Sequence, residues 1–330
     1  MGLCRTFSIS LLVVLVLLLS GCTDSTSSSG TSGFIGYGNG IKIHSLDFSS
    51  NIVYSGHPSL LTLEMQNLGA VDAKDIYLYL YGLSRGENEW FDDLSHITYS
   101  GAEKADDDPR VLVIDSLMAP VKSLGASGES AQVTWVLDAP KDLPEEQVFK
   151  YTAAVRVCYP YSTTSIAKVE ILDEDEYLFR DRAGTLNKHP IVFDTIASPL
   201  DVAMTIDQPM MLSENDEITF RVKIIDRGGG TITTQDCSEA FDWEENVLDL
   251  FTLHDKVTVT LGNRDCDFAL RDLYFRVSDS ASPTADFPVT CNIHSLDVPM
   301  QILDLKMKFE YNYFIDTSTV IGVEGVGEYP

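Results

Sequence analysis

The sequence predicts an all-β protein of two tandem antiparallel β-sandwiches, placed after a signal peptide and a flexible tether. Three observations support this prediction. Apolar residues alternate with polar ones in several runs, turn residues separate these runs, and the pattern of the first half recurs in the second half. The 330 residues are enough for two domains.

The N-terminus has the features of an export signal. Arg5 is the only charge ahead of an apolar run from Ile9 to Leu19, which Ser10 alone interrupts. A basic start, a short apolar core and small residues before a cleavage site are typical of a secretory signal peptide. We expect this signal over residues 1–21. An uncleaved membrane anchor is the first alternative, but it needs about 20 apolar residues. N-myristoylation of Gly2 is the second, and an export signal directly behind it argues against that modification.

The end of the signal resembles the lipobox of prokaryotic lipoproteins. The matching residues are Leu19, Ser20, Gly21 and Cys22. The resemblance implies cleavage before Cys22, lipidation of that cysteine, and attachment to the outer face of the cell membrane. Residues 22–40 then form a tether, because a stretch of Ser, Thr and Gly cannot bury enough apolar surface to offset the entropy of ordering.

Period-two alternation begins at residue 41 and predicts strands. Side chains two positions apart share one face of a strand, so each run indicates a strand with one buried face. Turn residues at 55–58, 67–69 and 108–109 separate the runs. The apolar positions of the clearest runs are Leu61, Leu63 and Met65; Val133, Trp135 and Leu137; and Phe149, Tyr151, Ala153, Val155, Val157, Tyr159 and Tyr161.

The second half repeats this pattern. A shift of 159 residues places Leu61, Leu63, Met65 and Gly69 on Phe220, Val222, Ile224 and Gly228. A shift of 152 residues places Val155, Val157, Tyr159 and Tyr161 on Met307, Phe309, Tyr311 and Tyr313. Two matches in the same order, at nearly the same offset, indicate tandem copies of one domain. Several short strands per copy predict sandwiches of immunoglobulin-like type.

These copies divide the chain into a first sandwich over residues 41–172, an acidic linker over 173–199 and a second sandwich over 200–325. Helical patterns are few. Residues 241–251 are the best short candidate for a helix, and residues 173–183 are a weaker one.

A family resemblance accompanies the first copy. Residues 55–58, followed by the strand pair at 60–82, resemble the repeat of prokaryotic cell-surface, adhesion-related (CARDB-like) immunoglobulin-like domains. Residues 213–230 are similar, but Asp226 stands where the first copy has Asn67. The whole pattern is similar to that of archaeal envelope lipoproteins. The resemblance implies a fold and a location, and it supplies no catalytic or binding residue.

Composition excludes one class of partner and sets the redox expectation. A net charge of −27 repels nucleic acid, and it suits a salty or cation-rich exterior. Beyond Cys22, the cysteines of the exported part are Cys158, Cys237, Cys266 and Cys291. Export allows disulfides in three pairings, and no metal-ligand spacing favours zinc. We expect Cys266 to pair with Cys291, which leaves the other two to bridge the domains or stay free. Glu310 is the counterpart of Cys158 and predicts an outward position for it.

Two further features bear on function. Tyr77, Tyr79 and Tyr81 alternate with aliphatic residues and form a stripe on one strand face. Exposed, the stripe would be a binding face for a glycan or a protein; covered, it would pack under a loop or the other domain, which we slightly favour. Acidic clusters at 106–108 and 173–176 are candidate calcium sites or solvated loops, and neither has EF-hand spacing. No other cofactor is indicated, and the identity of any metal stays open.

No catalytic motif stands out, so the sequence favours a non-enzymatic function. We expect a surface-anchored lipoprotein that binds or scaffolds in the cell envelope. Its expected partners are the membrane through the lipid anchor and envelope proteins or surface glycans. A ligand receptor or adhesin for a glycan or peptide is the first alternative, and an accessory subunit of a pilus or secretion complex is the second.

Overall fold

The structure is a computed structural model. It describes residues 40–85, 88–90, 97–105, 107–141, 143–204, 207–212, 217–233, 236–238, 257–268, 276–278, 281–293, 296 and 298–326. The signal peptide, the lipobox residues Leu19 to Cys22 and the predicted helix at 241–251 lie outside these residues. Within the described part, no helix is both long enough and apolar enough to cross a membrane.

The chain is mostly β, as the alternating runs predict, and its strands lie in two principal sheets. The smaller sheet is antiparallel in the order β1-β3-β10-β7. Its strands are β1 (Ile41–Phe48), β3 (Pro58–Asn67), β10 (Ser130–Asp138) and β7 (Thr98–Ser100).

The larger sheet has ten strands in the order β14-β17-β22-β20-β19-β23-β11-β4-β9-β8. They are β14 (Leu200–Met204), β17 (Glu217–Asp226), β22 (Ala281–Asn292), β20 (Arg264–Phe268), β19 (Val257–Leu261), β23 (Met300–Glu324), β11 (Val148–Leu172), β4 (Ala73–Gly82), β9 (Val111–Leu117) and β8 (Glu103–Lys104). Short strands join it from the side: β13 (Asp194–Thr195) and β16 (Met210–Met211) on β11, β2 (Ile52–Tyr54) and β18 (Thr231–Thr233) on β23, and β21 (Arg276–Ser278) on β22.

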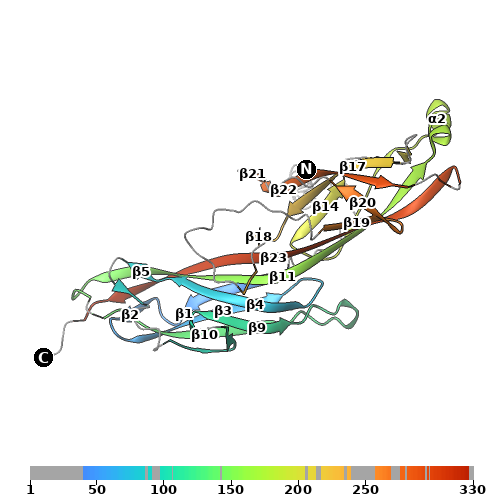
Figure 1. Ribbon diagram of the computed structural model, residues 1–330. Coiled ribbons are helices and arrows are strands. Elements are labelled where there is room, and N and C mark those ends of the chain that lie inside the picture. The colour runs from blue at the N-terminus through green and yellow to red at the C-terminus, as the bar shows by residue number, and fades with distance from the viewer. Residues whose placement is uncertain are drawn as a thin grey trace, which may run out of the picture. The chain divides into compact units, whose positions relative to one another are not determined.

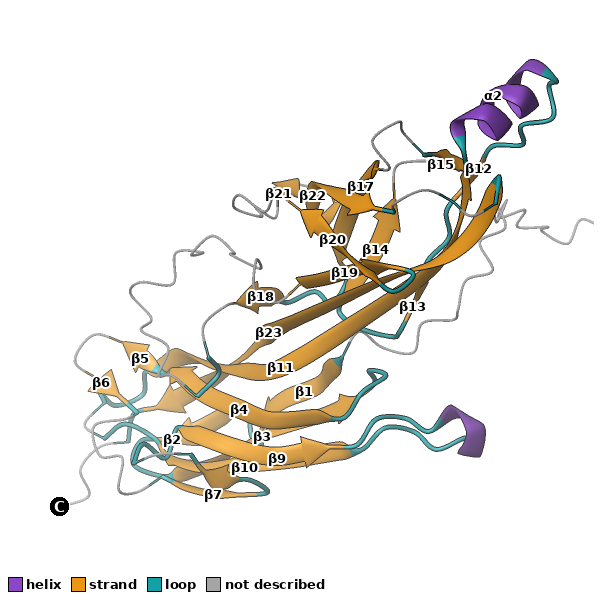
Figure 2. Cartoon of the chain, turned by 45° about the vertical axis from the view of Figure 1, so that its right-hand side comes forward, coloured by secondary structure: helices purple, strands orange, loops and turns teal. Residues whose placement is uncertain are grey.

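Two long strands, β11 and β23, connect the predicted sandwich segments. Each has 25 residues, and they pair antiparallel without a break from Val148 opposite Glu324 to Leu172 opposite Met300. Figures 1 and 2 show them side by side, with β1, β3 and β10 toward one end and β17, β20 and β22 toward the other. The segments 41–172 and 200–325 therefore contribute strands to one shared sheet.

The core is formed by the odd-numbered residues of β11 and β23 and by the strands stacked on them. Toward one end, the fully buried side chains of Leu63 and Trp135 belong to the same cluster as Val155. Toward the other end, Phe220 and Val289 join it together with Phe309. Burying one such side chain contributes roughly 1.5–3 kcal/mol, so these layers supply most of the driving force for folding.

Four tyrosines lie at the middle of the ladder. Tyr159 is opposite Tyr313, and Tyr161 is opposite Tyr311, with ring centroids 6.1 Å apart in both pairs. All four are buried and every hydroxyl is hydrogen-bonded. The partners are Ile41 N–H for Tyr159, Ala70 N–H and Ala197 C=O for Tyr161, Thr163 for Tyr311, and Gly230 N–H and Asp226 for Tyr313. We call this group the tyrosine cluster.

The predicted linker contains a helix. Helix α2 (Glu174–Arg182) begins after Asp173, whose carboxylate accepts a hydrogen bond from the Glu176 N–H at 2.7 Å. This is the weaker of the two helix candidates. Three acidic residues in its first turn and two arginines in its last turn complement the helix dipole. The remaining short elements are the 3₁₀ helix η2 (Lys122–Leu124) and two small sheets of β12 (His189–Pro190) with β15 (Asp207–Gln208) and β5 (Ser84–Arg85) with β6 (Asn88–Glu89).

Candidate functional site

The tyrosine stripe lies on the face of β4, β11 and β23 that points away from the core. Strand pairing sets its neighbours in rows across the sheet. Tyr79 is opposite Arg156, which is opposite Asp316, and Tyr77 is opposite Cys158, which is opposite Phe314. We call these six residues and Tyr81 the tyrosine face. Sequence analysis identified only the tyrosines, because the other members depend on the pairing of strands that are far apart in the chain.

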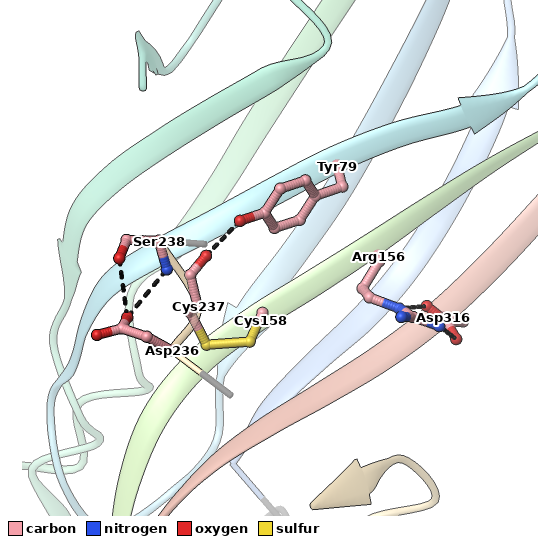
Figure 3. Close-up of a disulfide and its surroundings, with 7 residues drawn as sticks. All are labelled: Tyr79, Arg156, Cys158, Asp236, Cys237, Ser238 and Asp316. Carbon is pink, nitrogen blue, oxygen red and sulfur yellow. Dashed lines mark hydrogen bonds and ion pairs between the residues drawn. A yellow bond between two sulfur atoms is a disulfide. The ribbon is translucent and has the colours of Figure 1, made fainter. Parts of the chain in front are cut away.

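A disulfide covers the middle of the tyrosine face. Cys158 is joined to Cys237, which follows β18, with a Cα–Cα distance of 5.5 Å (Figure 3). The Tyr79 hydroxyl donates a hydrogen bond to the Cys237 carbonyl oxygen. Cys158, Cys237 and Tyr79 are only 0%, 2% and 3% exposed, and Tyr77 and Phe314 pack beside them. The expected outward position of Cys158 is therefore wrong: it points away from the main core but is fully buried under the segment that carries Cys237.

This cover changes what a ligand would meet. Tyr79 is inaccessible in this conformation, whereas Tyr77 and Tyr81 are partly exposed. The Tyr77 and Tyr79 rings are stacked, with centroids 6.4 Å apart. The residues around Cys237 are held locally, since the Asp236 carboxylate accepts hydrogen bonds from both the N–H and the hydroxyl of Ser238 at 3.0 Å. An aromatic platform of three open rings is thus not present, and the accessible tyrosines lie on either side of the covered one.

Beside the disulfide lies a charged pair. Arg156 donates two hydrogen bonds to the carboxylate of Asp316, at 2.7 and 2.9 Å, and its guanidinium lies 4.0 Å from the centroid of the Phe314 ring. A bidentate guanidinium–carboxylate pair is geometrically specific, and the aromatic contact holds the guanidinium flat. The Arg156 side chain is 11% exposed and that of Asp316 is 38% exposed, so a ligand could reach the carboxylate more readily than the guanidinium.

The environment of Tyr81 reflects these neighbours. Partial burial raises the pKa of its hydroxyl, the negative charge of Asp316 raises it further, and Arg156 opposes the rise. Tyr81 therefore stays a neutral hydrogen-bond donor and acceptor at physiological pH. Together with Asp316 and Tyr77, it gives the exposed part of the face apolar ring surface beside polar atoms, the combination that suits sugar rings and peptide backbones.

The second disulfide is the pair that we expected. Cys266 on β20 lies directly opposite Cys291 on β22, and the two are bonded with a Cα–Cα distance of 4.3 Å. Both are buried in the core, so this bridge fastens two strands of one layer.

The predicted calcium clusters have their described carboxylates engaged by protein groups. Arg110 forms a fork with Asp108 at distances of 2.5 to 3.0 Å. Burial would raise the pKa of Asp108, but the hydrogen bonds and charge of Arg110 outweigh it and lower the pKa. Asp173 caps α2, and Glu176 pairs with Arg180 at 2.6 Å. Asp106 lies outside the described residues. Among the described residues, no group of three or more potential ligands is arranged to hold a metal ion.

Comparisons with known proteins give no family. No family model and no curated protein matches the chain. Among solved structures, the sporulation control protein Spo0M from Bacillus subtilis is 13% identical, covering 56% of this chain and 79% of its own, with a TM-score of 0.19. The secreted serine protease VesC from Vibrio cholerae is 8% identical, covering 86% and 52%, with a TM-score of 0.17. The collagen adhesin of S. aureus is 7% identical, covering 89% and 95%, with a TM-score of 0.13. At these TM-scores, none of the three supports a statement about fold or function.

Proposed function

We propose that this protein is a non-catalytic, surface-anchored lipoprotein whose β body serves as a binding or scaffolding module in the cell envelope. The observation that carries the proposal is the unbroken pairing of β11 with β23. A ladder of 25 residue pairs with a hydrogen-bonded tyrosine cluster at its centre resists bending between its two ends. Such a body suits a protein that must hold a contact surface at a fixed distance from its anchor.

A tandem origin of this body is part of the proposal. Tyr161 and Gly69 correspond to Tyr313 and Gly228 under the two repeat shifts, and in both pairs the tyrosine hydroxyl lies against the glycine. A methyl group added at either glycine would come within 2.2 Å of that hydroxyl oxygen. The same contact at both ends supports two immunoglobulin-like sandwiches of common origin, related by a pseudo-twofold axis through the middle of the ladder.

Attachment to the membrane is tested by removing the lipidation site. In cells of the native source, we expect the wild type to take up labelled fatty acid and to sediment with membranes. Cys22→Ala should lose both properties, while Cys4→Ala, which changes a cysteine within the predicted signal, should keep them. Unlabelled wild-type protein, or labelled Cys22→Ala protein, would contradict the anchor.

A second candidate function is ligand capture at the tyrosine face. It is favoured by the partly exposed Tyr77 and Tyr81 beside the carboxylate of Asp316. We expect a bound glycan or peptide to raise the melting temperature of the wild type. Tyr81→Ala should abolish this rise, and Tyr54→Ala, which removes a 53% exposed tyrosine elsewhere, should not. Equal responses of both variants would exclude the tyrosine face as the site.

A further inference from the structure

One edge of β23 is open although both of its ends are covered. Strand β18 pairs with β23 up to Phe314, and β2 pairs with it from Gly322 onward (Figure 1). Between them lie the seven residues Ile315 to Ile321, and none of the described residues pairs with this stretch on the side away from β11. An unpaired row of backbone N–H and C=O groups is a template for another strand.

The direction of the backbone groups identifies which residues face this edge. The N–H of Gly322 donates to the Asn51 carbonyl on the open side of β23. Backbone groups alternate between the two sides of a strand, so those of Asp316, Ser318 and Val320 face the same way. The backbone groups of Thr317 and Thr319 face β11 instead, opposite Val155 and Ala153.

The corresponding edge of β11 is occupied, and it shows what such an edge accepts. The shift of 152 residues places Thr164 and Ile166 at the positions of Asp316 and Ser318. There, β13 adds an antiparallel strand, with Ser165 opposite Thr195 and Ile166 opposite Asp194. The Ile196 N–H donates to the Thr164 carbonyl at 3.1 Å, and the hydroxyls of Ser165 and Thr195 lie 2.9 Å apart.

Burial differs between the two edges in the same sense. Ser165 is fully buried and Ala167 is 3% exposed. Their counterparts under the same shift, Thr317 and Thr319, are only half-buried. Two core-facing positions therefore lack, on β23, the cover that β13 and its neighbours give on β11.

We propose that the open edge of β23 binds a short extended segment of a partner polypeptide by β-strand addition. This inference rests on the proposed function as a binding module and supplies its interaction site. The partner strand would be antiparallel and, like β13, would place a hydroxyl residue opposite the core-facing threonines. Backbone hydrogen bonds to Asp316, Ser318 and Val320 would supply the affinity.

The length of the gap excludes a second copy of β23 as the occupant. Only seven residues are open, and β18 and β2 block both ends of the stretch. A partner's β23 would run past both ends and collide with these strands, since it has 25 residues. A short peptide segment that leaves the sheet at each end meets no such obstacle.

The test measures amide hydrogen exchange in the full-length chain, with a synthetic peptide that copies residues 191–199 as the probe. We expect saturating peptide to slow exchange at Asp316, Ser318 and Val320 by at least about tenfold, a change that a stable hydrogen bond produces. Ser318→Pro should abolish the slowing without unfolding the protein, because it removes an N–H that points out of the ladder. Ser318→Val keeps that N–H and should bind the peptide like the wild type. Val320→Pro tests the same edge should Ser318→Pro fold poorly.

Three results would overturn the proposal. One is the absence of slowing at these amides, and another is equal slowing in Ser318→Pro or Val320→Pro. The third is slow exchange at the edge before peptide is added, which would mean that the chain itself fills the gap. A Ser318→Pro protein that still crosslinks to the same envelope partners as the wild type would exclude this edge while leaving the proposed function intact.

Discussion

At the scale of single residues, hydroxyl groups and one carboxyl fasten the middle of the molecule. Asn67 and Asp226 occupy equivalent places at the ends of β3 and β17. The Asn67 side chain donates to the carbonyls of Val71 and Leu117 and accepts from the Gly69 N–H. Asp226 accepts from the Gly228 N–H and from Tyr313, and it is 4% exposed. One half of the fold thus holds a neutral amide where the other half holds an acid.

Burial makes Asp226 sensitive to pH. Burial raises its pKa, and the hydrogen bonds from Gly228 and Tyr313 only partly oppose this rise. Because the pKa is higher in the folded state than in the unfolded chain, the contribution of Asp226 to stability is fully present below the unfolded pKa. It is lost as pH rises through the folded pKa. We therefore expect Asp226→Asn to raise the free energy of unfolding at pH 7 by about 1 kcal/mol, and to change it little at pH 3.5.

The reciprocal substitution is the control for this prediction. Asn67→Asp places a carboxylate where two carbonyl oxygens now accept hydrogen bonds from the amide, so it should destabilise the protein at pH 7 by roughly 2–4 kcal/mol. Denaturant titrations at both pH values measure the two effects. An Asp226→Asn protein that is less stable than the wild type at pH 7 would refute the assignment of a buried, disfavoured charge.

The tyrosine–glycine contacts give a second prediction at this scale. Gly69→Ala should destabilise the protein, because the added methyl group would approach the Tyr161 hydroxyl oxygen to 2.2 Å. Tyr161→Phe removes that oxygen and its hydrogen bonds, at a cost of about 1 kcal/mol. In the double variant, the loss should be at least about 1 kcal/mol smaller than the sum of the single losses. Additive losses in denaturant titrations would show that the contact is not the reason for glycine.

At the scale of elements, strands β11 and β23 organise the fold. Their alternation is visible in the sequence, and the positions predicted to be apolar are those that face the core. The strands β3 and β10 and the equivalence of β3 with β17 were likewise predictable. The pairing of β11 with β23 was not, because alternation fixes which face of a strand is buried but not which distant strand lies beside it.

The candidate site was predictable only in part for the same reason. The stripe of Tyr77, Tyr79 and Tyr81 follows from local spacing. The Arg156–Asp316 pair joins residues 160 positions apart, and the cover from Cys237 comes from a segment 79 positions beyond Cys158. Period-two spacing could place Cys158 beside the stripe, but no local signal identifies what lies above it.

The two disulfides should differ in their contribution to stability. Cys158–Cys237 closes a loop with a separation of 79 residues, and Cys266–Cys291 closes one of 25. In the chain-entropy model, the longer loop stabilises by about 1 kcal/mol more, out of roughly 3–4.5 kcal/mol for each bridge. We expect the double variant Cys158→Ala/Cys237→Ala to lose more stability than Cys266→Ala/Cys291→Ala in denaturant unfolding. The opposite order would indicate that the buried pair on β20 and β22 is fixed by packing that the entropy model omits.

At the scale of the whole molecule, charge is the dominant property. The net charge of −27 on 330 residues opposes compaction through self-repulsion, which salt screens. We expect the melting temperature to rise when sodium chloride increases from 0.05 M to 1 M, by several degrees. Sucrose of equal osmolarity is the control for general exclusion effects. A melting temperature that falls with salt would show that attractive charge pairs, such as Arg156–Asp316, outweigh the repulsion.

The central claim is that this body binds other components of the cell envelope. Crosslinking on intact cells of the native source, followed by mass spectrometry of what is joined to the protein, tests it most directly. The account predicts one reproducible set of envelope proteins or surface glycans with the wild type, and its loss with Cys22→Ala. Crosslinks to cytosolic proteins, or no reproducible crosslink above the level of Cys22→Ala, would contradict it.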